Sequence, residues 1–161
     1  MKYGACSWTF GEEPLADTAA RLASFGFDGL ELLGDLGRYE PGHVRRVLSD
    51  HGLAVLSLTP ENVDLAHPDP ALRTAAVDYY CRLLDFAAAL GNPVVCCHGA
   101  VGRVRAVATY TEEWGYYVEG VRSVGGRKPY TINWPSSPDW LSPSFWPPAR
   151  LPIGSRSSRA S

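Results

Sequence analysis

The hydrophobic positions in the first three quarters of the chain repeat one pattern, in which a helix-type apolar stripe is followed by a glycine and a short apolar run. The first stripe has the three-to-four spacing of an amphipathic helix and consists of Leu15, Ala19, Leu22 and Ala23. It ends at Gly26, and glycine often terminates helices because it adopts the left-handed conformation at little steric cost. Residues 29–33 then form an apolar run broken only by Glu31, which indicates a strand.

The same unit follows a second time between residues 44 and 58. Its helical stripe consists of Val44, Val47, Leu48 and His51. Gly52 ends this stripe, and the apolar run 54–58 indicates the next strand.

The third unit carries the clearest helix signals. Asp69 suits the N-cap of a helix and Pro70 suits its first turn. The apolar stripe expected to face inward consists of Leu72, Ala76, Tyr79, Leu83, Phe86, Ala87 and Leu90. Gly91 ends this helix, and residues 93–98 are expected to form its strand.

A fourth helix is expected from Thr109, because Thr109 and Glu112 have the spacing of a capping box. Its inward residues are expected to be Trp114, Tyr117, Val118, Val121 and Val124. With an opening strand at 3–7, strands and helices alternate, and strands joined through helices run parallel with right-handed crossovers. The sequence therefore predicts an α/β fold of parallel (β/α) units. Four such units amount to about half of a (β/α)8 TIM barrel of roughly 250 residues.

Charge and proline divide the 161 residues into two regions. Residues 1–124 hold 16 acidic and 10 basic residues, a net charge of −6, whereas residues 125–161 hold one acidic and five basic residues, a net charge of +4. The second region also contains seven of the 13 prolines and no periodic apolar pattern. Because proline removes backbone donors, we expect a partial barrel over 1–124 and an irregular tail, either disordered or out of frame, over 125–161.

Several classes of function are disfavoured by composition. The net charge of −2 gives no basic footprint for nucleic acid, and no apolar run approaches the roughly 20 residues of a membrane span. The N-terminus lacks a signal-peptide pattern, so a cytoplasmic location is expected. The four cysteines contain no C-x-x-C pair and are interpreted as reduced, small apolar residues of the core.

Candidate chemistry lies at the ends of the expected strands, because ligands of parallel α/β folds gather there. His98 follows an apolar run and would bind a metal or a substrate hydroxyl, or else be a buried histidine bonded to a backbone carbonyl. Glu31 lies between leucines and needs a cation, a metal, a hydroxyl-rich ligand or an arginine. Trp8 would stack on a sugar face or fill the barrel mouth.

Other polar residues have simpler explanations. Asp64 lies in a loop long enough to reach the site, but loop acids are commonly solvated. Arg103, Arg105 and Arg122 would hold a phosphate or form a solvated surface. Glu113 is explained by the helix dipole.

Four stretches resemble the sugar phosphate isomerase/epimerase family of xylose isomerase-like TIM barrels, and they lie at residues 3–8, 26–32, 64–73 and 88–95. The resemblance covers 1–124 and does not specify a substrate. It implies a divalent metal, manganese or magnesium, and a small sugar or sugar phosphate that is isomerised or epimerised through an enediolate. It matches Glu31 to a recurrent second-strand glutamate and His98 to a fourth-strand histidine that binds metal in the endonuclease branch.

The family's metal ligands, a Glu, an Asp, a His and a Glu on strands five to eight, have no match in this sequence. After Val124 there is no histidine, and Asp139 is the only acidic side chain. We therefore expect the first half of an isomerase, inactive alone, whose open edges favour self-association. Residues 155–161 can be written in codons that, read one nucleotide earlier, encode Ile-Ala-Ile-Glu-Pro-Gly-Leu, which is similar to a fifth strand of the family. The alternatives are a non-catalytic half-barrel assembly module and an endonuclease IV-like enzyme, which the charge of 1–124 disfavours.

Overall fold

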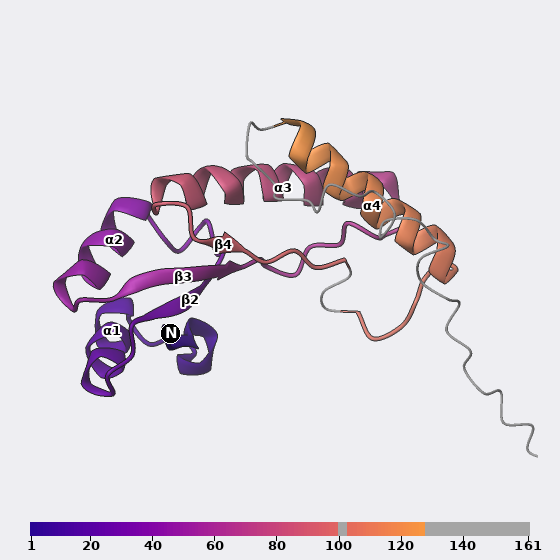
Figure 1. The fold of residues 1–161 in the computed structure, drawn as a ribbon. Helices are drawn as coiled ribbons and strands as arrows, with labels where there is room; N and C mark the ends of the chain where they lie inside the picture. Colours follow the sequence, from indigo (N-terminus) through magenta and orange to yellow (C-terminus); the bar gives the residue numbers. More distant parts are fainter. Residues whose placement is uncertain (100–102, 128–161) are drawn as a thin grey trace, which may run out of the picture. The chain divides into compact units, whose positions relative to one another are not determined.

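The computed structural model describes residues 1–99 and 103–127, which form alternating strands and helices (Figure 1). In chain order the elements are β1 (Gly4–Cys6), the 3-10 helix η1 (Ser7–Phe10), α1 (Leu15–Ser24), β2 (Gly29–Leu33), α2 (Pro41–Asp50), β3 (Ala54–Thr59), α3 (Pro70–Ala89), β4 (Val94–Val95) and α4 (Tyr110–Arg127). The predicted tail begins at residue 125, but α4 continues to Arg127. The rest of that prediction falls on 128–161, outside the described residues.

The four strands form one parallel sheet in the order β1-β2-β3-β4, as the alternation of elements predicts. Each strand lies beside the strand that precedes it in the sequence, which is the order in a (β/α) barrel. The sheet is not closed, since β1 and β4 are its two edges in the described part of the chain. The predicted fold class, an α/β fold of parallel units amounting to a partial barrel, is confirmed.

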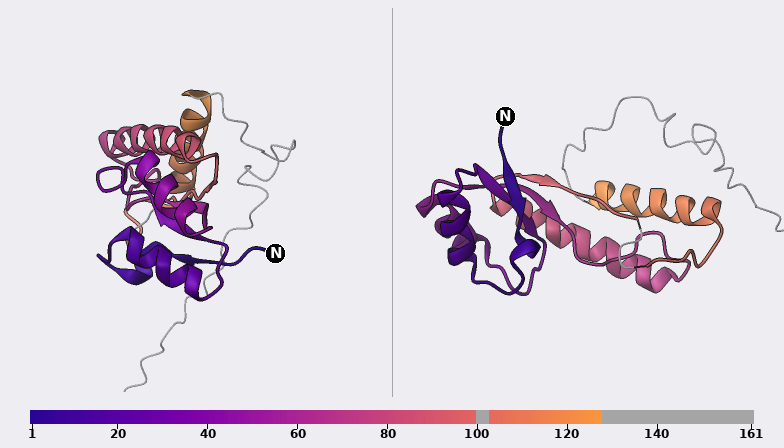
Figure 2. Two further views of the ribbon diagram at one scale, coloured as in Figure 1. Left: turned by 90° about the vertical axis from the view of Figure 1, so that its left-hand side faces the viewer. Right: turned by 90° about the horizontal axis from the view of Figure 1, so that it is seen from below.

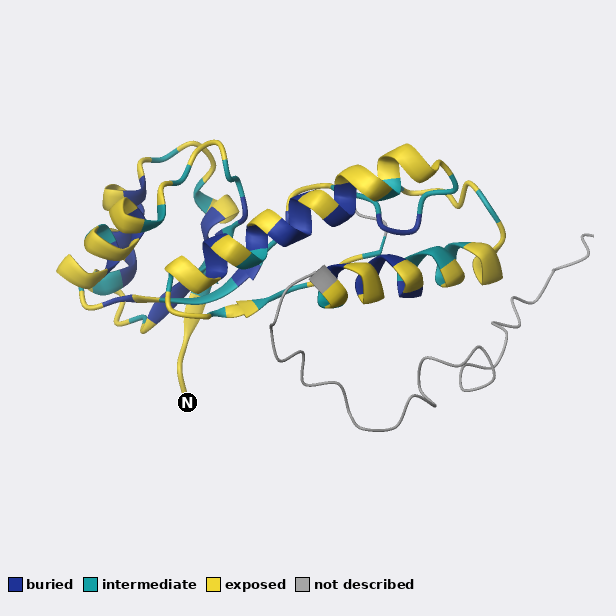
Figure 3. Cartoon of the chain, turned by 90° about the horizontal axis from the view of Figure 1, so that it is seen from above, coloured by how far each residue is buried: buried dark blue, intermediate teal, exposed yellow. Residues whose placement is uncertain are grey.

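The helices cover one face of the sheet. Leu30, Leu32 and Leu58 point to this face and have no exposed surface. They form one core with buried residues of the helices, among them Leu22 of α1 and Leu83 of α3. Figure 2 shows α1 and α3 on the same side of the strands, and the buried positions of α3 face the sheet in Figure 3. The other face of the sheet is free of helices in the described residues.

Local signals in the sequence set the helix ends. The Asp69 carboxylate accepts a hydrogen bond from the Ala71 N–H at 2.8 Å and caps α3. Thr109 and Glu112 form the predicted capping box, in which the Glu112 carboxylate accepts from the Thr109 N–H at 2.9 Å. Gly91 has a φ of 97° just after α3, so its lack of a side chain is required there.

Three predictions within these elements are wrong. Residues 93–98 were expected to form a strand, but β4 contains only Val94 and Val95, because after Cys96 the main chain leaves β3. Leu72 was expected to face inward and is 48% exposed on the outer side of α3. Cys97 was expected to be a small core residue and is exposed, although all four cysteines are free.

The described helices include none with the length and apolar character needed to cross a bilayer.

Candidate functional site

The helix-free face of the sheet carries a carboxylate near the carboxyl ends of the strands. Glu31 lies in the middle of β2, in register with Cys6 at the end of β1 and with Ser57 of β3. Its Oε1 accepts a hydrogen bond from the Thr59 hydroxyl, and its Oε2 lies 3.7 Å from the Cys6 sulfur, which donates to it. Adjacent strands thus supply a hydroxyl and a thiol to one half-buried carboxylate.

The thiol beside Glu31 stays protonated under ordinary conditions. Burial, and then the negative charge of Glu31, raise the pKa of Cys6 above its usual value. A protonated thiol can donate a weak hydrogen bond to a carboxylate, whereas a thiolate would repel it. From the sequence, Glu31 was expected to pair with an arginine or with a cation, a metal or a hydroxyl-rich ligand. The salt bridges among the described residues do not include Glu31.

A β-bulge brings Thr59 to Glu31. Leu30 pairs with Val55, but Glu31 pairs with Ser57, so that Leu56 is the extra residue in β3. The bulge shifts the alternation of β3, because Leu58 then faces the helices and Thr59 faces the open side with Glu31. Sequence analysis did not identify Thr59 as a site residue; the available signal was the polar alternation of Ser57 and Thr59 within an apolar strand.

The extra residue of this bulge is accommodated by two glycines. The Leu56 side chain lies across neighbouring strands, where a Cβ on Gly4 would lie 2.7 Å from its Cδ1 and a Cβ on Gly29 would lie 2.9 Å from its Cγ. Contacts this short do not occur with real side chains, so both positions require glycine while Leu56 stays in place.

Trp8 lies beyond the end of β1 on η1 and is 46% exposed. The preceding residue fixes this short helix to β2, since the Leu33 N–H donates to the Ser7 hydroxyl at 2.9 Å. Trp8 therefore lies at the carboxyl end of the sheet, as predicted, with its ring available for contact. Its assignment as a substrate-binding residue stays a prediction.

His98 lies beyond β4, and its residue is exposed rather than buried. Its backbone N–H donates to the Tyr80 hydroxyl of α3 at 3.0 Å, which fixes the main chain at this position. Ser57 is in register with both Glu31 and Val94, so His98 follows by four residues the β4 position that is level with Glu31. The structure thus brings Glu31, Thr59 and Cys6 together and places His98 further out at the same end of the sheet.

A cavity of about 500 Å³ adjoins His98 below α4 and is lined in part by Glu113, Trp114 and Tyr117. Cys97 also lines this cavity. Burial is the main cause that raises the pKa of the Tyr80 and Tyr117 hydroxyls, so both stay protonated and neutral.

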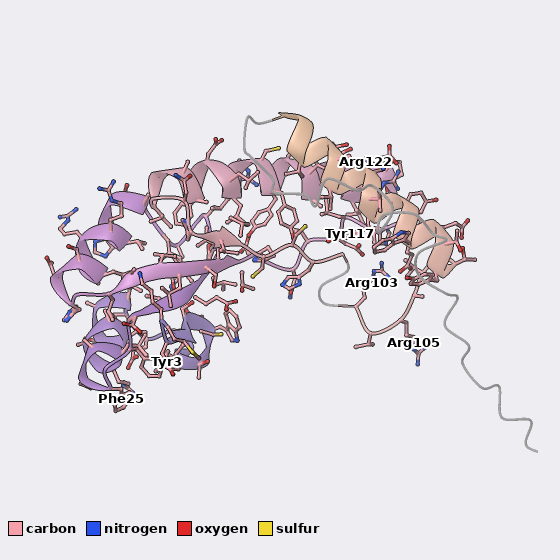
Figure 4. The ribbon with its side chains drawn as sticks, in the orientation of Figure 1. Tyr3, Phe25, Arg103, Arg105, Tyr117 and Arg122 are labelled. Carbon is pink, nitrogen blue, oxygen red and sulfur yellow. The ribbon has the colours of Figure 1, made fainter. Side chains whose placement is uncertain are left out.

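A charged cluster closes the outer end of this region. The Arg103 guanidinium forms salt bridges with Asp64, from the loop after β3, and with Glu113 of α4, the latter at 3.0 Å. The hydrogen bond from Arg103 lowers the pKa of Glu113 and, with that to Asp64, raises the pKa of Arg103. The solvated alternative left open for Asp64 and for Arg103 is wrong, because each side chain is more than four-fifths buried in this contact. Figure 4 shows Arg103 and Tyr117 together near α4.

The described residues do not form a divalent metal site. No group of three or more His, Cys, Asp or Glu side chains in 1–99 and 103–127 lies close enough to hold an ion. Glu31 lies within β2, whereas His98 lies beyond the end of β4, and each would require metal ligands from elsewhere. The assignment of His98 as a metal ligand therefore stays a prediction from the sequence.

Comparison with solved structures identifies the fold. The chain is similar to D-psicose 3-epimerase from Clostridium cellulolyticum H10, solved with D-tagatose, with a TM-score of 0.68 and 21% identity over 78% of this chain and 48% of that protein. It is also similar to an AP endonuclease of family 2 from Brucella melitensis, with a TM-score of 0.60 and 19% identity over 79% of this chain and 51% of that protein.

A third similar structure is a xylose isomerase-like TIM barrel protein from Mycobacterium smegmatis in complex with magnesium, with a TM-score of 0.58 and 19% identity over 78% of this chain and 50% of that protein. The chain thus spans about half the length of these proteins. The profile of one protein family, the xylose isomerase-like TIM barrel, matches residues 19–127. The chain belongs to the xylose isomerase-like TIM barrel family.

Proposed function

We propose that residues 1–124 are the first four (β/α) units of an enzyme that isomerises or epimerises a small sugar or sugar phosphate. The observation that carries the proposal is the Glu31 carboxylate, which lies on the helix-free face of the sheet and is held by Thr59 from the neighbouring strand. In a closed barrel this face is the interior, and active sites lie at its carboxyl end. The fold likeness to an epimerase solved with a ketohexose supports a sugar as the ligand.

The described residues would bind substrate rather than carry out the reaction. Carboxylate oxygens accept hydrogen bonds from sugar hydroxyls, and exposed indole rings stack on the apolar faces of sugars. Glu31 and Trp8 provide these two groups at one end of the sheet, and His98 adds a donor or acceptor further out.

We further propose that the 161-residue chain is inactive alone. Groups that move the substrate proton, and ligands for manganese or magnesium, would come from barrel strands beyond the described part of the chain. The hypothesis that the tail is out of frame predicts that the adjoining genomic DNA encodes these strands in a second frame.

The test begins with that DNA. Residues 1–124 are joined to the (β/α) units it encodes, and the product is assayed with ketoses, aldoses and their phosphates in the presence of Mn²⁺. We expect turnover by the joined protein and none by the 161-residue chain. Glu31→Gln should lower kcat/KM at least about tenfold, as expected for the loss of one charged contact worth about 1.5 kcal/mol, while the exposed Glu61→Gln serves as a control. DNA that encodes no further barrel strands, or a joined protein without turnover, would refute the proposal.

A further inference from the structure

Two adjacent tyrosines of α3 reach the ends of three different strands. The Tyr79 hydroxyl donates a hydrogen bond to the Gly34 carbonyl oxygen, just after β2, and accepts one from the Glu61 N–H, beyond β3, both at 2.8 Å. Tyr80 accepts from the His98 N–H beyond β4. Successive residues of a helix point about 100° apart, so two neighbours on one helix can contact different strands. The main chain at the carboxyl ends of β2, β3 and β4 is thus bonded to one helix.

The Tyr79 hydroxyl closes a ring of hydrogen bonds around Thr59, the last residue of β3. The Gly34 N–H donates to the Thr59 carbonyl oxygen at 2.7 Å. Gly34 is therefore held on both sides, by Thr59 through its N–H and by Tyr79 through its carbonyl oxygen. Glu61, two residues after Thr59, is bonded to the same tyrosine hydroxyl. The ring fixes the end of β3 relative to the end of β2.

The residue that follows Thr59 explains why a side chain of α3 is needed here. Pro60 has no N–H, so it provides no donor with which β3 could extend its pairing. A residue before proline prefers an extended backbone, which suits Thr59 at the end of a strand. The next main-chain donor after Thr59 is the Glu61 N–H, and Tyr79 supplies its acceptor.

Tyr79 is fixed in its own place by burial and by close packing. The residue is only 4% exposed, and burial is the main cause that raises its pKa to about 12. Its hydroxyl therefore stays neutral and can donate and accept at the same time. A Cβ on Gly34 would lie 2.7 Å from the Tyr79 hydroxyl oxygen, so this approach requires glycine at position 34.

We propose that Tyr79 is a positioning residue for the Glu31 carboxylate. The Thr59 hydroxyl donates to Glu31, and the Thr59 main chain is held in the ring that Tyr79 closes. A hydroxyl on the helix-covered face of the sheet thus acts on the open face through Thr59. The inference rests on the proposed function in one respect, namely that Glu31 contacts the sugar. The position of the carboxylate itself is measurable in the 161-residue chain without any ligand.

The neighbouring tyrosine provides a matched control. The rings of Tyr79 and Tyr80 contact each other edge to face, with centroids 5.7 Å apart, and both residues are buried. The hydrogen bonds of their hydroxyls go to different parts of the chain. Replacing either tyrosine with phenylalanine removes one hydroxyl and keeps the ring. Tyr79→Phe should therefore displace Glu31, whereas Tyr80→Phe should affect only the chain at His98.

The test follows the Glu31 side chain by NMR in the full 161-residue chain. Thr59→Val removes the hydrogen bond to Glu31, and it defines how the Glu31 ¹³Cδ resonance shifts when that bond is lost. Tyr79→Phe should shift this resonance in the same direction. The Glu61 amide should exchange at least about tenfold faster in Tyr79→Phe, because its acceptor is gone. Tyr80→Phe should change neither the resonance nor the Glu61 amide.

A double variant shows whether Tyr79 acts through Thr59. In the Thr59→Val background, Tyr79→Phe should cause no further shift of the Glu31 resonance, because residues of one network do not act additively. Gly34→Ala, which displaces the Tyr79 hydroxyl but keeps the tyrosine, should shift Glu31 as Tyr79→Phe does and replaces that variant if it fails to fold.

Three results would overturn the proposal: an unchanged Glu31 resonance in Tyr79→Phe, an equal shift in Tyr80→Phe, or a shift from Tyr79→Phe that persists at full size in the Thr59→Val background. The last two would mean that any change in the packing of α3 disturbs Glu31. None of these results bears on sugar binding, which is tested by turnover of the joined protein and by its Glu31→Gln variant. The proposed function and the positioning role of Tyr79 can therefore fail separately.

Discussion

The hydroxyl of Thr59 donates a hydrogen bond to Oε1 of Glu31, joining β3 to β2 on the face of the sheet that the described helices leave open. This bond exists because the bulge at Leu56 turns Thr59 to the same side as Glu31. A half-buried carboxylate is thereby kept in place without a salt bridge among the described residues. The carboxylate remains able to accept a hydrogen bond from a ligand, since each of its oxygens has two lone pairs.

Thr59→Val should lower the free energy of unfolding by about 1 to 2 kcal/mol, because it removes a donor to a charged group and leaves the shape of the side chain nearly unchanged. Thr59→Ser keeps the hydroxyl and should lose much less. Urea unfolding of the two variants measures the difference. Equal losses in the two variants would mean that the Thr59 methyl group, rather than its hydroxyl, stabilises this position.

Gly29→Ala should destabilise the sheet by about 2 to 3 kcal/mol, the upper range for overpacking in a filled site. The added Cβ would lie 2.1 Å from the Ala54 carbonyl oxygen, so β2 and β3 would have to separate. Gly115→Ala is the matched control, because nothing outside its own helix lies within 4 Å of that position in α4. It should stabilise the chain by about 0.5 to 1 kcal/mol through helix propensity. Thermal unfolding should therefore shift in opposite directions for the two variants.

The parts of the fold that the sequence predicts well are those set by local interactions. Asp69 caps α3 through a neighbour two residues away, and Gly91 ends the same helix through its own backbone conformation. Both effects depend only on residues close in sequence, so spacing and residue type are sufficient to predict them. The parallel order of the strands follows from the alternation of these elements.

The parts that the sequence does not predict depend on contacts between distant residues. The bulge at Leu56 is set by the register of β3 against β2. The salt bridge between Arg103 and Asp64 depends on how two loops that are distant in sequence come together. The shortness of β4 is also a tertiary effect, because the His98 N–H bonds to Tyr80 of α3 instead of to a strand. Glu31 was recognised as unusual, but the Thr59 hydroxyl that holds it was not.

Arg103→Met should cost about 2 to 3 kcal/mol, between the values for exposed and buried ion pairs, because it leaves Asp64 and Glu113 without a cation. Arg105→Met is the control, since the Arg105 carbonyl rather than its side chain accepts a hydrogen bond from Arg103. Chemical denaturation at pH 7 measures both. A loss no greater for Arg103 than for Arg105 would show that the cluster is screened by solvent.

The same cluster should make stability depend on acid pH. The hydrogen bond from Arg103 holds the pKa of Glu113 below its ordinary value, so the folded state favours the carboxylate. This contribution is complete above the unfolded pKa of about 4.3 and is lost as the pH falls through the lower folded pKa. Glu113→Gln should therefore flatten the fall in unfolding free energy below about pH 5. Some dependence of the unfolding free energy on acid pH should remain in this variant, because hydrogen bonds with Thr109 also lower the pKa of Glu112.

Tyr80→Phe should loosen the chain at His98 while leaving α3 packed. The Tyr80 hydroxyl accepts from the His98 N–H at 3.0 Å and lies 3.5 Å from the His98 carbonyl oxygen, so its removal takes away the acceptor that positions this residue. The ring of Tyr80 is buried in the core, and phenylalanine fills the same space. Because water can reach the exposed His98, the loss in unfolding free energy should be only about 1 kcal/mol.

Hydrogen exchange distinguishes this local effect from general destabilisation. In Tyr80→Phe the His98 amide should exchange at least tenfold faster. The exchange rates of amides in the centre of α3 should change only as much as the change in global unfolding free energy requires. Tyr110→Phe, at an exposed tyrosine of α4, should change neither. If the His98 amide kept its protection in Tyr80→Phe, the position of His98 would be set by the loop itself, and α3 would have no part in arranging this end of the sheet.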